Sequence, residues 1–329
     1  MEECLGSRSR ASCEKGCAPD SEPQLPALRQ GKGRQSMTMP NFLIIGAMKS
    51  GTTALYYYLE QHPQIYMSPV KEPDFFCAGG QESWDGESVT RMGAYRSLFK
   101  GVSDEKAIGE ASHCYLYEPQ AAARIQQYLP DAKLVAILRN PVDRAYSHFL
   151  HMVRNGTEPL NDFAQALREE ETGAYGDRRL QDYLGRGLYY AQLKRYFDAF
   201  DRKQLKVYLY EDLTDAPIDT LQDTFRFLGV DDSFVPDVSL RRNVSGYPKY
   251  QALDKLLSRP SSVKDALKVY LPARLRWRLS RAFDDLKTRN LVKPPAVESE
   301  SRRRLRSFYR EDILKVQELI HRDLSGWLA

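Results

Sequence analysis

One lysine, three hydroxyl side chains and two glycines lie close together near position 50. They are Gly46, Lys49, Ser50, Gly51, Thr52 and Thr53. Where a glycine-containing loop opens a helix, its backbone N–H groups point into one concavity and favour anions, helped by the helix dipole. The Lys49 ammonium would add a mobile positive charge, and the hydroxyls would add hydrogen-bond donors. The spacing therefore predicts a binding site for a phosphate or a similar oxyanion.

The segments on either side of this loop read as a strand and a helix. Residues 42–45 form a short apolar, β-branched run, which is typical of a buried strand. Residues 54–61 follow a helical pattern that stops before Pro63. A standard Walker A loop carries its lysine after the last glycine, but here Lys49 comes before Gly51. The loop is therefore not a standard ATP-binding loop.

A second polar group follows the clearest buried strand, residues 133–138. Arg139 ends this strand, and Asn140-Pro141 then supplies an N-cap and a proline for the first position of a helix that runs to about residue 154. Ser147 lies on that helix. A guanidinium makes paired hydrogen bonds to a phosphate and a hydroxyl adds a donor, so Arg139 and Ser147 predict a second oxyanion contact.

These two segments resemble known motifs. The order GxxKSGTT at a strand-to-helix turn resembles the 5′-phosphosulfate loop of sulfotransferases that use 3′-phosphoadenosine-5′-phosphosulfate (PAPS). The segment AILRNPVDRAYSHF resembles the 3′-phosphate motif of the same family, which implies that Arg139 and Ser147 hold the 3′-phosphate. The resemblance covers roughly residues 40–329.

Two further segments resemble the heparan-type branch of the family. PVKEPDFF is similar to the segment that supplies its catalytic glutamate, which puts that role on Glu72. RRNVSGYPK is similar to its late cofactor loop, whose aromatic residue packs on adenine; here that residue is Tyr247. The loop also contains Ser245, Gly246 and Lys249, and Ser245 stands where the family often has a lysine.

The reaction that the resemblance implies is in-line transfer of a sulfuryl group from PAPS to an acceptor oxygen or nitrogen, without a metal. Lys49 would stabilise charge on the leaving phosphate oxygen, and Glu72 would take the acceptor's proton. Desolvation would raise the pKa of Glu72, and Lys71 would lower it if its ammonium pointed inward. His113 is the rival base, because imidazole titrates near neutrality. Glu110 is a further candidate, as a base or to orient the substrate.

Strands that alternate with helices predict an α/β fold: a P-loop-like three-layer arrangement with a central parallel sheet flanked by helices. Ligands of such sheets bind at the carboxyl ends of the strands, where Lys49, His113 and Arg139 are expected. Residues 1–38 lack apolar periodicity and are predicted to be a disordered extension. Residues 39–329 would form a single sulfotransferase domain.

Composition limits the partners of this chain of 329 residues. A net charge of +4 is too mild to indicate nucleic acid, and no apolar run is long enough to span a membrane. The cysteine count is odd, at five, and does not suggest a disulfide framework. We therefore expect free thiols and a cytoplasmic enzyme of the bacterial, soluble type. The acceptor stays open among small metabolites, carbohydrates and lipids, and the sequence does not predict the oligomeric state.

Two other functions compete with sulfuryl transfer. A P-loop nucleotide kinase or NTPase could use residues 207–212, VYLYED, as a Walker B strand, although the lysine is then out of place. A non-catalytic module that binds nucleotides or sulfated ligands would keep Lys49 and Arg139 and need no base.

Overall fold

Two strands with unbroken apolar sequences form the centre of the sheet. β1 (Phe42–Gly46) and β4 (Lys133–Leu138) run parallel, with Leu43 opposite Leu134. All of β1 and the last five residues of β4 are buried. A strand that is covered on both faces needs apolar side chains on both, which explains why these runs are continuous instead of alternating. The predicted strands at 42–45 and 133–138 are confirmed.

Three more strands complete a five-stranded sheet in the order β2-β3-β1-β4-β5. They are β2 (Ile65–Met67), β3 (Ala107–Ala111) and β5 (Leu205–Leu209), and each runs parallel to its neighbour. β3 continues to Ala111, so Glu110 lies inside the sheet and not in the loop after it. The central parallel sheet that the sequence predicts is confirmed.

The computed structural model describes residues 38–78, 89–173, 181–239, 247–248, 291–292 and 295–329. The predicted extension, except for its last residue, lies outside these ranges. Within them, no helix is long and apolar enough to cross a membrane. The other elements are helices and one two-stranded antiparallel ribbon: α1 (Thr52–Leu59), α2 (Phe75–Ala78), α3 (Met92–Ser97), α4 (Cys114–Tyr117), α5 (Ala121–Tyr128), α6 (Pro141–Asn155), α7 (Phe163–Glu171), η2 (Gly185–Gly187), α8 (Tyr189–Ala199), η3 (Arg202–Gln204), α9 (Tyr210–Asp215), α10 (Pro217–Leu228), β6 (Tyr247–Pro248), β7 (Leu291–Val292), α14 (Ser299–Ile320) and η4 (Ser325–Trp327).

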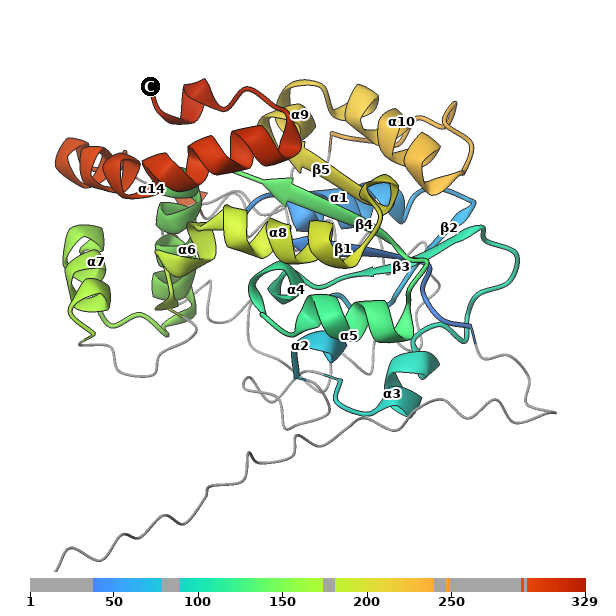
Figure 1. The fold of residues 1–329 in the computed structure, drawn as a ribbon. Helices are drawn as coiled ribbons and strands as arrows, with labels where there is room; N and C mark the ends of the chain where they lie inside the picture. The colour runs from blue at the N-terminus through green and yellow to red at the C-terminus, as the bar shows by residue number, and fades with distance from the viewer. Residues whose placement is uncertain (1–37, 79–88, 174–180, 240–246, 249–290, 293–294) are drawn as a thin grey trace, which may run out of the picture. The chain divides into compact units, whose positions relative to one another are not determined.

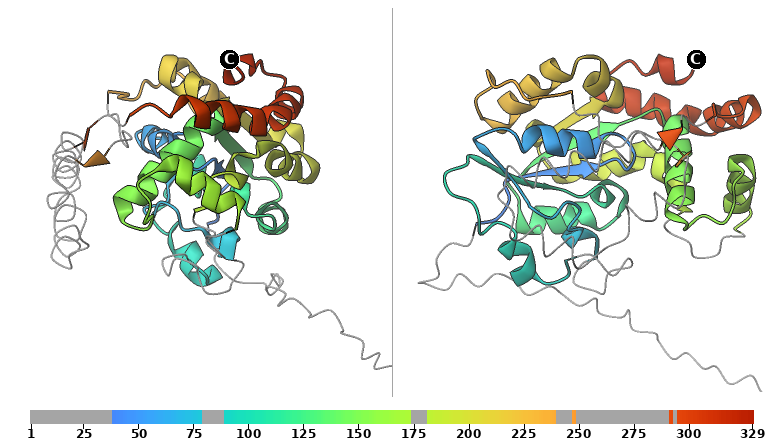
Figure 2. Two further views of the ribbon diagram at one scale, coloured as in Figure 1. Left: turned by 90° about the vertical axis from the view of Figure 1, so that its left-hand side faces the viewer. Right: turned by 180° about the vertical axis from the view of Figure 1, so that it is seen from behind.

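Helices cover both faces of the sheet, as Figures 1 and 2 show. Successive side chains of a strand point to opposite faces, and β1 follows this rule. Phe42 and Ile44 pack in one apolar core with α1 and α10, whereas Leu43 and Ile45 pack in a second core with α4, α5, α6, α8 and α14. The protein therefore has the expected three layers, with the sheet between two layers of helices.

The helix α6 begins and ends where the sequence predicts. The side chain of Asn140 accepts a hydrogen bond from the Val142 N–H, Pro141 occupies the first turn, and Gly156 ends the helix with φ 74°. This start fixes the helix directly after β4. Ser147 is consequently held two turns into the helix, in a buried position.

The helix α14 supplies the cap that α8 lacks. Leu188, the residue before α8, has no hydrogen-bonding side chain. The carboxylate of Asp312 accepts hydrogen bonds from the backbone N–H groups of Tyr189 at 2.8 Å and Tyr190 at 3.2 Å. The hydroxyl of Tyr189 in turn donates to the carbonyl of Arg139 at 2.9 Å. α14 and α8 thus support the segment that follows β4.

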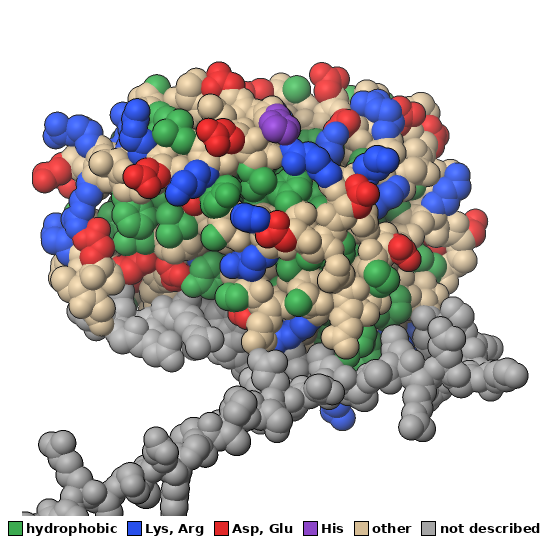
Figure 3. All heavy atoms as spheres, in the orientation of Figure 1, with side chains coloured by type: hydrophobic (Ala, Val, Ile, Leu, Met, Phe, Trp, Pro, Cys, Tyr) green, Lys and Arg blue, Asp and Glu red, His purple; other side chains and the backbone are tan. Residues whose placement is uncertain are grey.

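Basic and acidic side chains are interspersed on the face of the molecule that Figure 3 shows. Three ion pairs among the described residues illustrate the mixture: Arg302–Asp143, Arg304–Glu171 and Arg322–Asp212. Surface pairs of this kind contribute little to stability. This distribution agrees with the mild net charge, and the absence of a nucleic-acid partner stays a prediction.

Close packing of β3 on β1 generates a prediction for stability. A Cβ on Gly109 would overlap the ring of Phe42, which is fully buried and cannot move away freely. Gly109→Ala should therefore lower the free energy of unfolding by about 1–3 kcal/mol, measured by urea unfolding followed by circular dichroism. Gly93→Ala on α3 is the control, because its Cβ would meet nothing within 4 Å. Equal stability of both variants would contradict the packing described for Gly109.

Candidate active site

The loop between β1 and α1 has the form that the sequence predicts. β1 ends at Gly46, and α1 starts at Thr52 after Gly51, which adopts a left-handed conformation with φ 98°. No side chain caps the first turn of α1. The N–H groups of this turn are therefore available to an anion, since a helix N-terminus leaves its first donors without intrahelical partners.

Lys49 is held in this loop as a partly buried cation. The pKa of Lys49 is lowered to about 8, mainly by burial and then by the positive charges of Arg154 and Arg139, whereas the charge of Glu72 opposes this shift. A cation whose charged form is destabilised in this way gains from a bound anion. The electrostatics of the site therefore favour the binding of an anion.

Arg139 brings the second predicted motif against this loop. Its guanidinium donates to the backbone carbonyl of Lys49 at 3.2 Å and lies 4.7 Å from the ring centre of Tyr210. Arg139 directly follows β4, and Ser147 lies on the helix that follows. Because β1 and β4 are parallel neighbours, both motifs meet at the carboxyl edge of the sheet. The structure thus brings Lys49 and Arg139 together, and their contacts to a ligand stay predictions.

Glu72 and His113 form a pair at the carboxyl end of β3. Glu72 Oε1 lies 3.1 Å from His113 Nδ1, and the Lys71 ammonium also contacts this carboxylate. The backbone N–H of Glu72 donates to the carbonyl of Ala111 at 2.9 Å, which fixes the segment on β3. The two candidate bases are therefore in direct contact with each other.

The pKa of Glu72 is shifted in the direction opposite to the one expected from desolvation. Burial acts in that direction, but the His113 ring and the Lys71 ammonium outweigh burial and hold the pKa of Glu72 well below its usual range. The sequence left open whether Lys71 points inward, and it does. Glu72 is thus an ionised carboxylate at neutral pH.

Glu110 is not a base that faces a substrate. It is fully buried and accepts hydrogen bonds from the hydroxyls of Tyr115 at 2.6 Å, Ser112 at 2.9 Å and Tyr95 at 3.2 Å. Burial raises the pKa of Glu110 to about 7 against these bonds, which favour the ionised form. Ser112 also accepts the N–H of Asp74, two residues after Glu72. Glu110 is thereby linked, through Ser112, to the segment that carries Glu72.

Backbone strain marks the same region. Four non-glycine residues in the described part of the chain have positive φ, and three of them lie here: Lys49 at 65°, Glu72 at 63° and Asp74 at 53°. A left-handed conformation is costly for residues with a Cβ and persists where the surroundings determine it. Such strain commonly accompanies functional sites.

Sequence reasoning missed two side chains of α6. The pKa of His151 is lowered to about 3, mainly by burial and then by the charges of Lys49, Arg154 and His113. The ring is therefore neutral, and these charges place it near the candidate catalytic groups. The guanidinium of Arg154 lies 3.1 Å from His151 Nδ1. The helical spacing could have shown this, because His151 follows Ser147 by one turn and shares its face.

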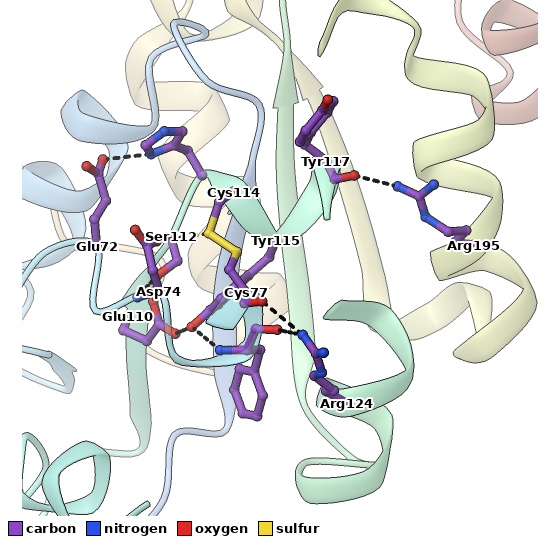
Figure 4. Close-up of a disulfide and its surroundings, with 12 residues drawn as sticks. Glu72, Asp74, Cys77, Glu110, Ser112, Cys114, Tyr115, Tyr117, Arg124 and Arg195 are labelled. Atoms are coloured by element: carbon purple, nitrogen blue, oxygen red, sulfur yellow. Dashed lines mark hydrogen bonds and ion pairs between the residues drawn. A yellow bond between two sulfur atoms is a disulfide. The ribbon is translucent and has the colours of Figure 1, made fainter. Parts of the chain in front are cut away.

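The expectation of free thiols is wrong for two of the cysteines. Cys77 and Cys114 form a disulfide with Cα atoms 6.4 Å apart, as Figure 4 shows, and the other three cysteines lie outside the described residues. The donor atoms of Asp74, Cys77 and Cys114 lie within 4.8 Å of one another, a spacing that could suit a metal ion. Bonded sulfurs cannot act as thiolate ligands, however, so the disulfide form offers no such site.

The late cofactor loop is only partly described. Ser245, Gly246 and Lys249 lie outside the described residues, and Tyr247 opens the strand β6, opposite Val292 of β7. Their predicted contacts to a nucleotide stay predictions.

Asp212, which follows β5, is not free to act as a Walker B carboxylate. Asp212 accepts the N–H of Leu209 at 2.8 Å and pairs with Arg322 at 2.8 Å. It therefore caps α9 and binds a C-terminal arginine. β5 is also the edge strand of the sheet, next to β4 and not to β1.

Comparison with known proteins gives a consistent picture. The family model described as "Sulfotransferase domain" matches residues 39–245. The chain is 34% identical over 155 residues to the membrane-associated sulfotransferase kil1 of Dictyostelium discoideum, covering 44% of this chain and 32% of that protein. It is 27% identical over 300 residues to the bifunctional heparan sulfate N-deacetylase/N-sulfotransferase 4 of Mus musculus, covering 88% of this chain and 31% of that protein. The chain thus spans about a third of the length of these curated relatives.

A solved structure agrees with the fold. The crystal structure of a sulfotransferase from Alicyclobacillus acidocaldarius has a TM-score of 0.68 and 34% sequence identity, and the match covers 89% of this chain and 100% of that one.

The lowered pKa of Lys49 predicts proton uptake on ligand binding. At pH 8 Lys49 is about half protonated in the free protein. A bound anion raises the pKa of Lys49, so the protein should take up about half a proton when 3′,5′-adenosine bisphosphate binds. Its affinity should fall as the pH rises above 8. Titration calorimetry at pH 8 in buffers of different ionisation enthalpy measures the uptake. In Lys49→Arg, whose guanidinium stays charged, the uptake should vanish; unchanged uptake in that variant would contradict the assignment to Lys49.

Proposed function

The chain belongs to the sulfotransferase family, and from this premise we propose that it transfers the sulfuryl group of PAPS to a hydroxyl or amine of an acceptor. The observation that carries the proposal is the contact of Arg139 with the backbone of Lys49 at 3.2 Å. It joins the loop that suits a 5′-phosphosulfate to the segment that suits a 3′-phosphate. A nucleotide with phosphates at both positions matches both.

The binding roles follow from the position of each group. The open first turn of α1 and the hydroxyls of its loop offer donors to the 5′-phosphosulfate, with Lys49 as the adjacent charge. Arg139 and Ser147 offer a guanidinium and a hydroxyl to the 3′-phosphate. The residues present thus fit the charge of PAPS, which supplies an activated sulfuryl group when bound.

The chemical roles in this scheme are stabilisation of charge and acceptance of a proton. Lys49 stabilises the negative charge that forms on the leaving phosphate oxygen, where a positioned cation has most effect. Glu72 accepts the proton of the acceptor as the new bond to sulfur forms, and His113 holds the carboxylate in place and stabilises its charge. His151 is kept neutral by burial and by the positive charges near it, among them that of Lys49. No step in this scheme requires a metal.

The acceptor class is the part of the proposal that rests on analogy. Several relatives are named as heparan sulfate N-deacetylase/N-sulfotransferases, which favours a carbohydrate amine or hydroxyl over a small metabolite or a lipid. Incubation of the purified chain with labelled PAPS and separate carbohydrate, lipid and small-molecule acceptors tests this.

The predicted cytoplasmic location loses the support of free thiols, because disulfides are rare in that compartment.

Arg139→Ala tests the cofactor assignment. The parent protein should bind 3′,5′-adenosine bisphosphate much better than 5′-AMP, and the variant should lose most of that preference. A charge-assisted hydrogen-bonded contact contributes about 1.5–3 kcal/mol, roughly ten- to hundred-fold in affinity. Calorimetric titration of both nucleotides measures this, with the exposed Arg303→Ala on α14 as the control. If the parent protein binds both nucleotides equally, the 3′-phosphate assignment is wrong.

Glu72→Gln and His113→Ala separate the two members of the pair. Glu72→Gln keeps the shape and removes the base, so kcat should fall about 10²–10⁴-fold while 3′,5′-adenosine bisphosphate still binds. His113→Ala should have a smaller effect. Both are assayed with one hydroxyl acceptor at several pH values, beside Glu60→Gln, an exposed residue after α1, as the control. An active Glu72→Gln together with an inactive His113→Ala would make His113 the base.

A further inference from the structure

The Cys77–Cys114 disulfide joins the two segments that carry the candidate catalytic pair. Cys77 lies in α2, five residues after Glu72, and Cys114 directly follows His113 and opens α4. Both cysteines are buried, and the bond lies to the right of Glu72 in Figure 4. Because Glu72 Oε1 and His113 Nδ1 are 3.1 Å apart, the covalent bond and this side-chain contact connect the same two segments.

The segment from Glu72 to Cys77 depends on its neighbours for its shape. Glu72 and Asp74 both have positive φ, a conformation that residues with a side chain avoid when unconstrained. Two of its hydrogen bonds run to the end of β3 and to the residue after it: the Glu72 N–H donates to the carbonyl of Ala111, and the Asp74 N–H donates to the hydroxyl of Ser112 at 3.1 Å.

The far end of this segment is anchored differently. Arg124 of α5 donates to the carbonyls of Phe76 at 3.0 Å and Cys77 at 2.9 Å. The disulfide is the one covalent constraint on the described part of this segment, and it removes conformations that hydrogen bonds alone would permit.

A neighbouring carboxylate makes the disulfide easier to reduce. The carboxylate of Asp74 lies 3.0 Å from Cys114 Sγ. In the dithiol, the Cys114 S–H can donate a hydrogen bond to this carboxylate, whereas the disulfide sulfur has no proton to donate. A hydrogen bond that forms only after reduction stabilises the reduced state and makes the bond easier to reduce.

We propose that the Cys77–Cys114 disulfide positions the Glu72–His113 pair, so that the rate of sulfuryl transfer depends on the oxidation state of these two cysteines. A dithiol reductant supplies two electrons and two protons: its thiols close into a disulfide, the bond between Cys77 and Cys114 breaks, and both become thiols. The inference rests on the proposed function, in which Glu72 accepts the acceptor's proton. Neither cysteine touches the reacting atoms; both act through Glu72 and His113.

The first experiment compares the oxidised and reduced full-length chain. The protein is purified without reductant and treated with dithiothreitol until mass spectrometry shows the gain of two hydrogens on the Cys77 and Cys114 peptides. Reduction should lower kcat about ten- to hundred-fold, because a displacement of roughly 1 Å at a reacting group can cost about a hundredfold. The affinity for 3′,5′-adenosine bisphosphate should stay unchanged, since Lys49 and Arg139 lie on other segments.

Matched variants show whether the effect passes through the pair. Cys77→Ala/Cys114→Ala should be as slow as the reduced protein and should not respond to dithiothreitol. A chain in which only Cys4, Cys13 and Cys17 are changed to serine should respond like the parent protein. In Glu72→Gln, reduction should no longer change kcat, whereas a merely structural bond would slow this variant as well.

A readout that does not depend on turnover tests the same idea. On reduction, the backbone amides of Glu72 and Asp74 should exchange with deuterium at least about tenfold faster. The amide of Arg144, bonded to Asn140 in α6, should not change. Unchanged exchange at Glu72 in fully reduced protein, or reactive thiols at Cys77 and Cys114 in protein purified without reductant, would overturn the inference.

These outcomes separate the inference from the proposed function. If sulfuryl transfer proceeds equally in both oxidation states, the positioning role is wrong and the proposed function stands. If no acceptor is sulfated in either state but exchange at Glu72 still accelerates on reduction, the proposed function fails and the disulfide still controls the segment.

Discussion

Lys49, Arg139 and Arg154 bring like charges together at the carboxyl edge of the sheet. Arg154, Arg139 and Lys71 all lower the pKa of Lys49, and Glu72 opposes them. The fold tolerates this repulsion because the cations around Lys49 make other contacts: Arg139 with the Lys49 carbonyl and the Tyr210 ring, Arg154 with His151, and Lys71 with Glu72. A polyanionic ligand relieves the repulsion, so part of the cost of folding this edge is recovered when the ligand binds.

The features that the sequence predicted correctly have local causes. A continuous apolar run is sufficient to identify β1 and β4, because both faces of a central strand are covered. Asn140 and Pro141 determine the start of α6 through hydrogen-bonding and dihedral preferences that involve only neighbouring residues. The parallel arrangement then brings Lys49 and Arg139 together without further information. These parts of the fold and site follow from short stretches of chain.

The features that sequence reasoning missed depend on contacts between distant segments. Glu110 reads as a polar residue near a strand end, but Tyr95 and Tyr115 enclose it and remove it from solvent. The disulfide requires α2 and α4 to meet, which no spacing within either segment indicates. The pKa of Glu72 likewise depends on the side chains that turn toward it. Each of these outcomes is decided by tertiary packing.

The cap that Asp312 provides to α8 has a consequence for the order in which the chain folds. The cap and the helix that it stabilises are 123 residues apart. During synthesis on a ribosome, α8 emerges well before α14, and its first turn lacks this cap until residue 312 has left the exit tunnel. Tyr189, whose hydroxyl supports the Arg139 carbonyl, sits in that first turn. The carboxyl edge of the sheet, where Arg139 lies, is therefore completed late in a nascent chain, after most of the domain already exists as polypeptide. Such long-range closure is slow and is reached only when the distant segments have been made.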